Sequence, residues 1–293
     1  MKLLFALVAV PLVLLALLAP VSSRPGREPE GCLDGCAHAS ARRSGPLRVL
    51  NLNVLHGFPT FARVEQRMAL IADEIERSDA DVICLQEVPT VVGLVNGAEW
   101  LAERTQRNHV FFRANGNRNT IGFEEGAAIL TRFPITHAAG TELAPRAPIF
   151  EHRIVLHARV AAPGGALDVF STHLAIDGRR NRGQTRDLVR VVEESAVGPV
   201  VVAGDFNAEE TSPQIAELAA RWTDSFRTLH PESAGATCCS GALRGGARRI
   251  DYVFAGAGLV PVSSRVILDA AVETSGGELH ASDHSGLLVE LER

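Results

Sequence analysis

Six short polar clusters interrupt or follow apolar runs in this sequence, and their residue types are those that hold metal ions and phosphate groups. They are Asn51-Leu52-Asn53, Gln86-Glu87, Ser171-Thr172-His173, Gly204-Asp205-Phe206-Asn207, Arg249-Ile250-Asp251-Tyr252 and Ser282-Asp283-His284. Burying a carboxylate, amide or imidazole without a partner costs several kcal/mol, so such groups rarely end buried strands by chance. We therefore expect the six clusters to meet at one end of a sheet.

Glu87 is the first candidate metal ligand. It follows the apolar run Val82-Ile83-Cys84-Leu85, which is typical of a buried strand. A lone acid at such a place is often an ordinary turn residue, but here several other acids also end strands. Carboxylate and amide oxygens suit Mg²⁺ or Mn²⁺, and Mg²⁺ usually takes one or two protein carboxylates.

Asp205 and Asn207 are candidates for positioning a water. They follow a run of Val and Ala, and their i, i+2 spacing points both side chains to the same side of an extended chain. An ordinary Asx turn is the structural alternative. We predict that Asp205 orients or deprotonates a water, and that Asn207 holds that water or a phosphate oxygen.

Two histidines are candidates for proton transfer. Asp283 and His284 place a ligand and an acid/base side by side, and Asp251 can fix the tautomer and orientation of His284. His173 also ends a strand, although an isolated histidine is more often a buried residue with a satisfied hydrogen bond. In this set we predict that it stabilises the charged transition state or protonates the leaving oxygen.

A serine nucleophile is the main competing chemistry. Ser171 and Ser282 lie near histidines, but the sequence contains no Gly-x-Ser-x-Gly motif. It also lacks the Gly-x-x-x-x-Gly-Lys-Ser/Thr phosphate loop and the His-Glu-x-x-His zinc motif. The sequence therefore does not support the chemistry of a serine hydrolase, a nucleoside triphosphatase or a zinc peptidase.

Alternating strand and helix signals position these clusters. Strands are predicted at 47–54, 80–88, 126–135, 153–160, 166–174, 199–203, 249–255, 260–268 and 285–291. Helices are predicted at 61–77, 98–106 and 181–196, and a fourth opens at Ser212-Pro213, where a capping residue precedes proline. The mixture of helical crossovers and hairpins predicts a mixed α/β fold.

The N-terminus differs from the rest of the chain. Residues 1–23 combine Lys2, an apolar run and a stretch of small residues, which predicts a secretory signal peptide. A membrane anchor formed by residues 3–19 is the alternative, although this run is short for a span of about 20 residues. Residues 24–46 are predicted to be a linker or arm, and residues 47–293 one catalytic domain. We expect a secreted, periplasmic or otherwise extracytoplasmic protein.

The five cysteines divide into one buried thiol and four candidates for disulfide bonds. Cys84 lies inside an apolar strand and is predicted to be free. In an exported protein, Cys32, Cys36, Cys238 and Cys239 can form two disulfides in three connectivities. We expect bonds between the 32/36 pair and the 238/239 pair, because a bond between adjacent cysteines is strained. A zinc site is the weaker alternative.

Taken in order, the clusters resemble the endonuclease/exonuclease/phosphatase superfamily of metal-dependent phosphohydrolases. Its members include DNase I-like nucleases, abasic-site endonucleases, bacterial sphingomyelinases and inositol-phosphate 5-phosphatases. The resemblance extends from about Leu47 to Leu291. It implies a four-layer α/β sandwich, in which two mixed β-sheets pack face to face with helices outside. It also implies a phosphodiesterase or phosphatase in which water attacks a phosphoester in line.

The resemblance implies a role for each polar side chain. Three residues are implied at the metal: Asn53, Glu87 and Asp283. Asp205 and Asn207 match the pair that aligns the water, and Asn53, Asn207 and His173 match substrate contacts. The implied cofactor is Mg²⁺, with Mn²⁺ as the alternative, and one or two ions fit the pattern.

The remaining implied roles concern protons. His173 matches the histidine that contacts the phosphate, His284 matches the essential acid/base, and Asp251 matches its partner. Either Asp205 or His284 takes the proton of the water.

The substrate is less well defined by the sequence. A net charge of −5 argues against avid non-specific binding of nucleic acid, and one Tyr and two Trp offer few base-stacking or membrane-interface side chains. We expect a small-molecule or lipid-headgroup phosphodiester, with a secreted nuclease or a sphingomyelinase-like enzyme as alternatives and a catalytically dead binding module as the weakest. The loops at 91–125, 142–153 and 209–249 are expected to select it. No protein partner is implied, and a monomer is expected.

Overall fold

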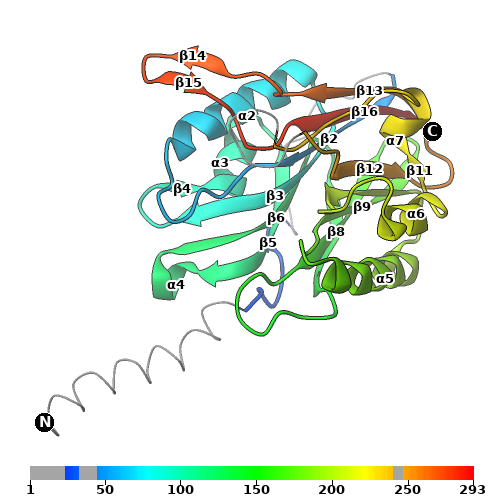
Figure 1. The fold of residues 1–293 in the computed structure, drawn as a ribbon, viewed down its shortest axis with the longest axis horizontal. Coiled ribbons are helices and arrows are strands. Elements are labelled where there is room, and N and C mark those ends of the chain that lie inside the picture. The colour runs from blue at the N-terminus through cyan, green and yellow to red at the C-terminus, as the bar shows by residue number, and fades with distance from the viewer. Residues whose placement is uncertain (1–23, 33–44, 240–246) are drawn as a thin grey trace, which may run out of the picture.

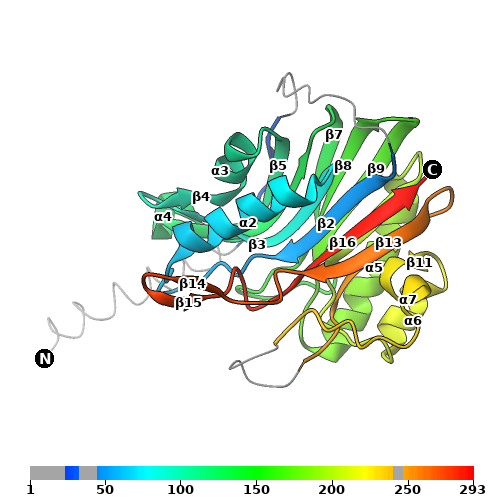
Figure 2. The same cartoon turned by 90° about the horizontal axis from the view of Figure 1, so that it is seen from above.

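Two β-sheets face each other, and helices cover the outer face of each (Figures 1 and 2). The computed structural model describes residues 24–32, 45–239 and 247–293. This arrangement confirms the predicted four-layer α/β sandwich. The predicted signal peptide or anchor lies outside the described residues, as does most of the predicted linker. Within the described ranges, no helix has both the length and the apolar character needed to cross a membrane.

The first sheet contains one parallel pair near its middle. Its order is β1 (Glu30–Gly31), β5 (Asn108–Asn117), β6 (Phe123–Thr131), β3 (Val82–Val91), β2 (Leu47–Asn53), β16 (Gly286–Glu292) and β13 (Val260–Ile267), and β4 (Val95–Asn96) pairs with β3. β2 and β3 run parallel. Helix α2 (Val64–Ser78) joins them, and α3 (Gly97–Arg104) follows β4.

The second sheet repeats this plan. Its order is β11 (Thr223–Asp224), β12 (Asp251–Ala255), β10 (Val200–Asp205), β9 (Gly165–His173), β8 (Ile154–Ala162) and β7 (Ile135–Glu142). β9 and β10 run parallel, and α5 (Gly178–Ser195) joins them. Three short helices, α4 (Arg118–Ile121), α6 (Pro213–Ala219) and α7 (Ser225–Leu229), and a hairpin of β14 (Val272–Thr274) and β15 (Gly277–Leu279) complete the fold.

Three apolar clusters hold the four layers together. The largest lies between the two sheets and contains Val49, Ile129 and Val201. A second packs α2 and α3 on the first sheet through Met68, Ile71 and Leu101, and a third packs α5 and α6 on the second sheet. Burial of a Val, Leu or Ile side chain contributes about 1.5–3 kcal/mol, so these clusters fix the strand ends in space.

The parallel pairs explain why the polar clusters converge. A helical crossover returns the chain to the same edge of the sheet, so both strands of a parallel pair end at one edge. Asn53, at the end of β2, lies opposite Gln86, the last residue of β3 that pairs with β2, and His173 lies opposite Asp205 at the end of β9 and β10. Asn53 Nδ2 donates to Asp205 Oδ2 across the two sheets at 3.1 Å. The two edges therefore face one another.

Three segments illustrate where the structure differs from the sequence-based expectations. Residues 24–46 were predicted as an arm, yet Glu30 and Gly31 form β1, which pairs with Phe111 and Val110 at the edge of the first sheet. β5 was not predicted, because Arg113, Asn115 and Asn117 interrupt its apolar pattern. The predicted strand 126–135 is also divided: β6 ends at Thr131 and β7 begins at Ile135.

Candidate active site

A bulge in β3 presents Glu87 to the site. The register between β3 and β6 shifts between Leu85 and Val88, and Glu87 adopts a φ of 54°. This left-handed conformation is uncommon for a residue with a side chain, and bulges often re-aim side chains beside active sites. Gln86 remains fully buried, while Glu87 is only partly buried.

Asn53 and His56 hold the Glu87 carboxylate from the loop after β2. Asn53 Nδ2 donates to Glu87 Oε1 at 3.1 Å, and the backbone N–H of His56 donates to Oε2 at 3.2 Å. The imidazole Nε2 of His56 lies 3.5 Å from Oε2. Because the Asn53 amide also reaches Asp205, it joins the predicted metal ligand to the predicted water-positioning acid.

Asp205, Asn207 and His173 form the opposite side of the site. The backbone N–H of Asn207 donates to Asp205 Oδ1 at 2.9 Å, and Asn207 Nδ2 lies 3.0 Å from His173 Nε2. Burial and the charge of Asp251 raise the pKa of Asp205. Burial, with the nearby Arg153 charge, holds the pKa of His173 well below its usual value, so this imidazole is neutral at pH 7.

His284 is oriented by Asp251, as predicted from their residue types. Its Nδ1 lies 2.9 Å from Asp251 Oδ2, which leaves Nε2 facing Asp205 Oδ2 at 3.7 Å. Thr237 Oγ1 donates to the same Asp251 oxygen at 2.7 Å. Burial alone would lower the pKa of His284, but the Asp251 and Asp205 carboxylates outweigh burial and raise it.

Asp283 lies beside this pair and is partly exposed. Ser282 Oγ donates to the Asn53 carbonyl at 2.6 Å and lies 3.3 Å from Asp283 Oδ1. Burial lowers the pKa of Arg67, and the charges of Asp283 and Glu87 oppose this shift. Both predicted metal ligands therefore lie within electrostatic range of the same guanidinium group.

The donor set fits a divalent cation. Four carboxylates converge here, from Glu87, Asp205, Asp251 and Asp283, and in the described part of the chain none has an arginine within 4.0 Å. Asp251 Oδ1 is buried without a hydrogen-bond partner among these residues. Ligand atoms of Asp205, Asp251 and His284 also lie within 4.8 Å of one another. Carboxylate oxygens are the ligands that a hard ion prefers, and Glu87 and Asp283 supply two more carboxylates at this site.

Two residues that organise the site were not identified from the sequence. Arg67 donates to the carbonyls of Val54 (2.7 Å), Leu55 (2.8 Å) and Ala281 (3.3 Å), so it ties together the loops that carry His56 and Asp283. A signal was present, because Arg67 lies on the buried stripe of its helix beside Met68. Thr237 left no comparable signal, since it comes from an irregular loop.

The cysteine pairing differs from the prediction. Cys238 is bonded to Cys239, which excludes the expected bonds from these residues to Cys32 and Cys36. Cys32 is itself disulfide-bonded, and Cys36 lies outside the described residues. Cys32 donates its N–H to the His109 carbonyl at the β5 edge, whereas Cys238 pairs with Arg248 and His284, so Cys32 and Cys238 lie in different parts of the fold. Cys84 is free and buried, as predicted.

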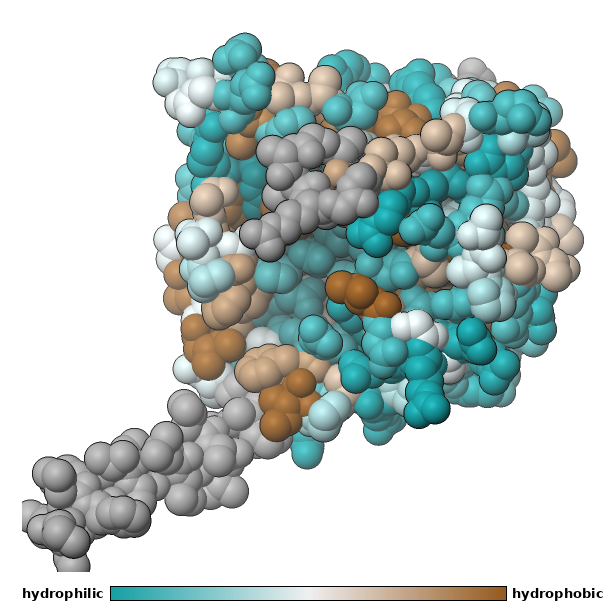
Figure 3. Space-filling model, viewed as in Figure 1, coloured by the Kyte–Doolittle hydropathy of each residue, from teal (hydrophilic) through white to brown (hydrophobic). Residues whose placement is uncertain are grey.

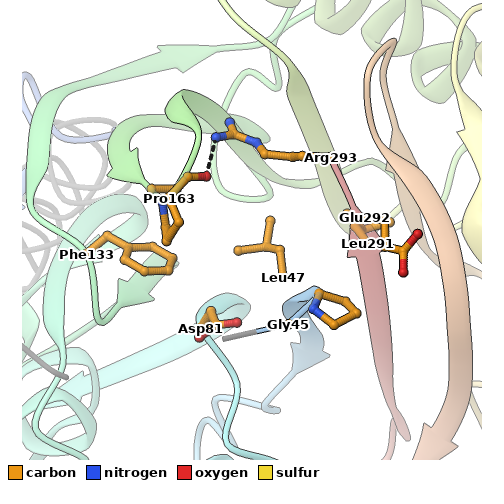
Figure 4. Close-up of a pocket in the computed structure, with 10 residues that line it drawn as sticks. Gly45, Leu47, Asp81, Phe133, Pro163, Leu291, Glu292 and Arg293 are labelled. Atoms are coloured by element: carbon orange, nitrogen blue, oxygen red, sulfur yellow. Dashed lines mark hydrogen bonds between the residues drawn. The ribbon is translucent and has the colours of Figure 1, made fainter. Parts of the chain in front are cut away.

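One large hollow adjoins these groups. A pocket of about 580 Å³ includes Glu87 in its lining. Another pocket, of about 310 Å³, is lined by Leu47 at the start of β2 and by Leu291 near the end of β16. In this second pocket Arg293 donates a hydrogen bond to the Pro163 carbonyl at 2.8 Å (Figure 4). Asn53 ends β2, so the length of that strand separates the second hollow from the catalytic groups.

Comparisons with known proteins agree with this geometry. The chain is 32% identical over 176 residues to the uncharacterized protein YbhP of Escherichia coli K12; the match covers 55% of this chain and 66% of that relative, just under two thirds of its length. The human Nocturnin catalytic domain with bound sulfate superposes with a TM-score of 0.66 at 22% identity, covering 85% of this chain and 94% of that one.

The mannosyl-6-phosphatase of Bacteroides thetaiotaomicron superposes with a TM-score of 0.67 at 17% identity, covering 84% of this chain and all of that one. These two likenesses establish the DNase I-like fold. The endonuclease/exonuclease/phosphatase family profile matches residues 50–284, a span that begins in β2 and ends at His284. The chain therefore belongs to the endonuclease/exonuclease/phosphatase family, whose members are hydrolases that act on phosphoester bonds.

Proposed function

We propose that this protein is an exported, Mg²⁺-dependent phosphohydrolase that cleaves a phosphodiester by direct attack of water. The observation that carries the proposal is the meeting of Asn53, Glu87, Asp205 and His284 where the two parallel strand pairs end. Export is supported by the apolar, small-residue character of residues 1–23. The sulfate bound to the human Nocturnin domain supports an anion site of phosphate size in this fold.

The residues divide into four groups by the work they do. Glu87, Asn53 and Asp283 would hold the cation, which when bound neutralises the phosphate and stabilises the leaving oxygen. Asp205 and Asn207 bind and orient the attacking water. His284, held by Asp251, exchanges a proton at Nε2, where it faces Asp205. Neutral His173 contacts a phosphate oxygen and stabilises the charge that develops there.

A metal-dependent assay tests the proposal directly. We expect hydrolysis of bis-p-nitrophenyl phosphate with Mg²⁺ and none with EDTA, and we expect Mn²⁺ to substitute in part. Glu87→Gln should lose activity through the metal site, and His284→Ala should lose it through proton transfer. Wild-type turnover in both variants would refute the site assignment.

Substrate class needs a parallel comparison. Plasmid DNA, sphingomyelin and inositol phosphates are each incubated with the protein, with Mg²⁺ or with EDTA. We expect turnover of small or headgroup phosphodiesters to exceed nicking of the plasmid, because the net charge is −5. Nicking without lipid turnover would identify a nuclease instead.

A further inference from the structure

A pocket beside Glu87 has features that the hydrolytic chemistry leaves unexplained. We call it the side pocket; Phe58, Ile121, Phe123 and Phe150 form its apolar wall, and Asn115, Glu125 and Arg153 add polar groups. Its volume of about 580 Å³ exceeds what a phosphate alone requires and falls in the range of small organic ligands. Figure 3 shows one face of the molecule with a hydrophilic hollow and hydrophobic residues at its margin.

Aromatic rings dominate the apolar wall. Phe58 stacks on Phe123, with centroids 5.2 Å apart and an angle of 22° between the rings, and Phe61 supports Phe123 at 5.1 Å. Phe58 is 56% exposed and Phe150 is 45% exposed, and both line this pocket. Rings that remain exposed around a hollow can gain burial by packing against the two faces of a flat group.

The backbone holds Phe150 in place at some cost. Phe150 and Glu151 adopt φ values of 53° and 52°, a conformation that is unfavourable for residues other than glycine. The next residue, His152, fixes the segment: its N–H donates to Asn115 Oδ1 at 2.9 Å, and its ring Nδ1 lies 2.6 Å from Glu142 Oε1. Phe150 therefore has a defined position at the rim.

Arg153 follows this segment and has no partner of its own. In the ranges the structure describes, its guanidinium makes no hydrogen bond and no ion pair within 4.0 Å, and its buried Nε is unsatisfied. It lines the side pocket together with Glu87, and it lines a small adjoining cavity with Glu87 and His173. An arginine in this state is suited to bind an anion, because its planar fork matches phosphate oxygens.

We propose that the side pocket binds a flat ring on the organic group of the phosphoester, while Arg153 contacts an oxygen of its phosphate. The inference rests on the proposed function and names the substrate class of the same site. Arg153 provides the link, because it lies between the cavity that holds His173 and the aromatic wall.

The polar end of the pocket favours a ring with hydrogen-bonding edges over an alkyl chain. Glu125 is buried and accepts at Oε1 from Asn115, and no hydrogen bond reaches its Oε2 from the described residues. An alkyl chain would leave that oxygen unsatisfied, which is costly in a closed site. A heteroaromatic ring can donate to it while stacking on Phe58 and Phe150.

Binding measurements on a matched ligand pair test the ring. Binding is measured by calorimetry with Mg²⁺ on the His284→Ala variant, because this variant should not consume the ligand. Adenosine 5′-monophosphate differs from ribose 5-phosphate only by its base. We expect the nucleotide to bind about tenfold tighter or more, as stacking on aromatic side chains predicts. Phe58→Leu and Phe150→Leu in that background should remove most of the difference, because leucine keeps apolar area and loses the ring.

Two further variants complete the design. Val260→Ala, which alters an equally exposed apolar residue outside the pocket, should leave both affinities unchanged. Arg153→Gln should weaken both ligands by a similar factor, since both carry the phosphate, and Arg153→Lys should recover part of the loss.

Three outcomes would overturn the proposal. The first is equal affinity for the two ligands, and the second is failure of the nucleotide to bind. The third is hexyl phosphate binding as tightly as the nucleotide with no loss in Phe58→Leu, which would assign the pocket to an alkyl chain. Hydrolysis of bis-p-nitrophenyl phosphate is measured separately on the wild-type protein. Its absence would refute the proposed function, and active protein with no ring preference would refute only the pocket.

Discussion

At the scale of single residues, Asp251 determines what His284 can do. The Asp251 carboxylate accepts from Nδ1, so Nε2 is left to exchange a proton near Asp205. Asp251→Asn keeps the size of the side chain but allows the other tautomer. We expect kcat to fall by about 10²- to 10⁴-fold with little change in KM. Steady-state kinetics with bis-p-nitrophenyl phosphate measures both, and a rise in KM at constant kcat would contradict this role.

Thr237 offers a matched control for the same pair. Its hydroxyl donates to Asp251 Oδ2 and accepts from the backbone N–H groups of Ile250 and Asp251. Thr237→Val removes the hydroxyl, and Thr237→Ser retains it. If the hydroxyl orients Asp251, kcat should fall in the valine variant and remain near wild type in the serine variant.

The site residues that could be predicted from the sequence are those that lie at the end of an apolar strand. Asn53, Glu87, His173 and Asp205 each end an apolar run, and the cost of burying such groups without partners was sufficient to predict that they meet. Arg153 and Thr237 were not found, because they come from irregular segments. There the position of a side chain depends on loop geometry such as the positive φ of Phe150, which has no periodic signature.

At the scale of elements, Arg67 connects helix α2 to the two loops that flank the proposed cation site. Its guanidinium binds carbonyls of Val54, Leu55 and Ala281, and lysine cannot reach all three with one ammonium group. We expect Arg67→Lys to raise the Mg²⁺ concentration for half-maximal activity by about 10- to 100-fold, as outer-shell changes commonly do. Titration of activity with Mg²⁺ measures this shift.

A structural control separates positioning from folding in this test. Arg77 lies on the same helix, is exposed, and contacts Glu74. Arg77→Lys should leave the Mg²⁺ requirement unchanged. An unchanged requirement in Arg67→Lys, with an intact thermal transition, would contradict the positioning role.

The segment Thr237–Cys239 is a second element whose structure can be tested. Cys238 exchanges backbone hydrogen bonds with Arg248, Cys239 donates its N–H to the Asp283 carbonyl, and the two cysteines are bonded to each other. Non-reducing peptide mapping should therefore find both in one oxidised peptide, with Cys84 as a free thiol. A peptide containing Cys32 linked to one containing Cys238 would restore the connectivity expected from the sequence.

Elements with a strong period were the ones that could be predicted. The helix at Val64–Ser78 and the strands at Leu47–Asn53 and Val200–Asp205 agree with their sequence patterns, because one face or both faces are buried. β1 could not be predicted. It has two residues and exists only because β5 offers an unpaired edge, so its cause lies in the tertiary structure.

At the scale of the whole molecule, the two halves share one plan and meet through polar side chains. Each half has a parallel pair joined by a helix, and a buried amide network connects the pairs beneath the site. Gln86 Nε2 donates to Asn51 Oδ1 and to Ser171 Oγ, both at 3.0 Å, and Asn51 Nδ2 donates to the Gly204 carbonyl at 3.3 Å. Such directional contacts fix the register of one sheet against the other, which apolar packing alone does less specifically.

Stability of the second half depends on a buried acid far from the site. Asp168 is fully buried on β9 and accepts from the N–H groups of Val197 and Gly198, and from His157 and Arg159. Burial alone would raise the pKa of Asp168, but the Val197 and His157 hydrogen bonds outweigh burial and hold it below its usual value. Burial also lowers the pKa of His157.

Both shifts make the folded state less stable in acid. When folding lowers the pKa of a group, that group stabilises the folded state at pH values above the pKa that it has in the unfolded chain, and this stabilisation is lost as the pH falls toward the pKa in the folded state. The pKa in the unfolded chain is about 6.5 for His157 and about 3.9 for Asp168. We expect the thermal midpoint to decline below about pH 6.5 and more steeply below about pH 4. Asp168→Asn should lower stability by about 3 kcal/mol at pH 7, because it removes the charge that pairs with Arg159 and replaces one acceptor oxygen by an NH₂ group that faces other donors. The Asp168→Asn variant should also lose less stability in acid than the wild type does, as scanning calorimetry across this pH range would show. If the stability of the variant falls with pH in parallel with that of the wild type, the acid sensitivity belongs to other groups.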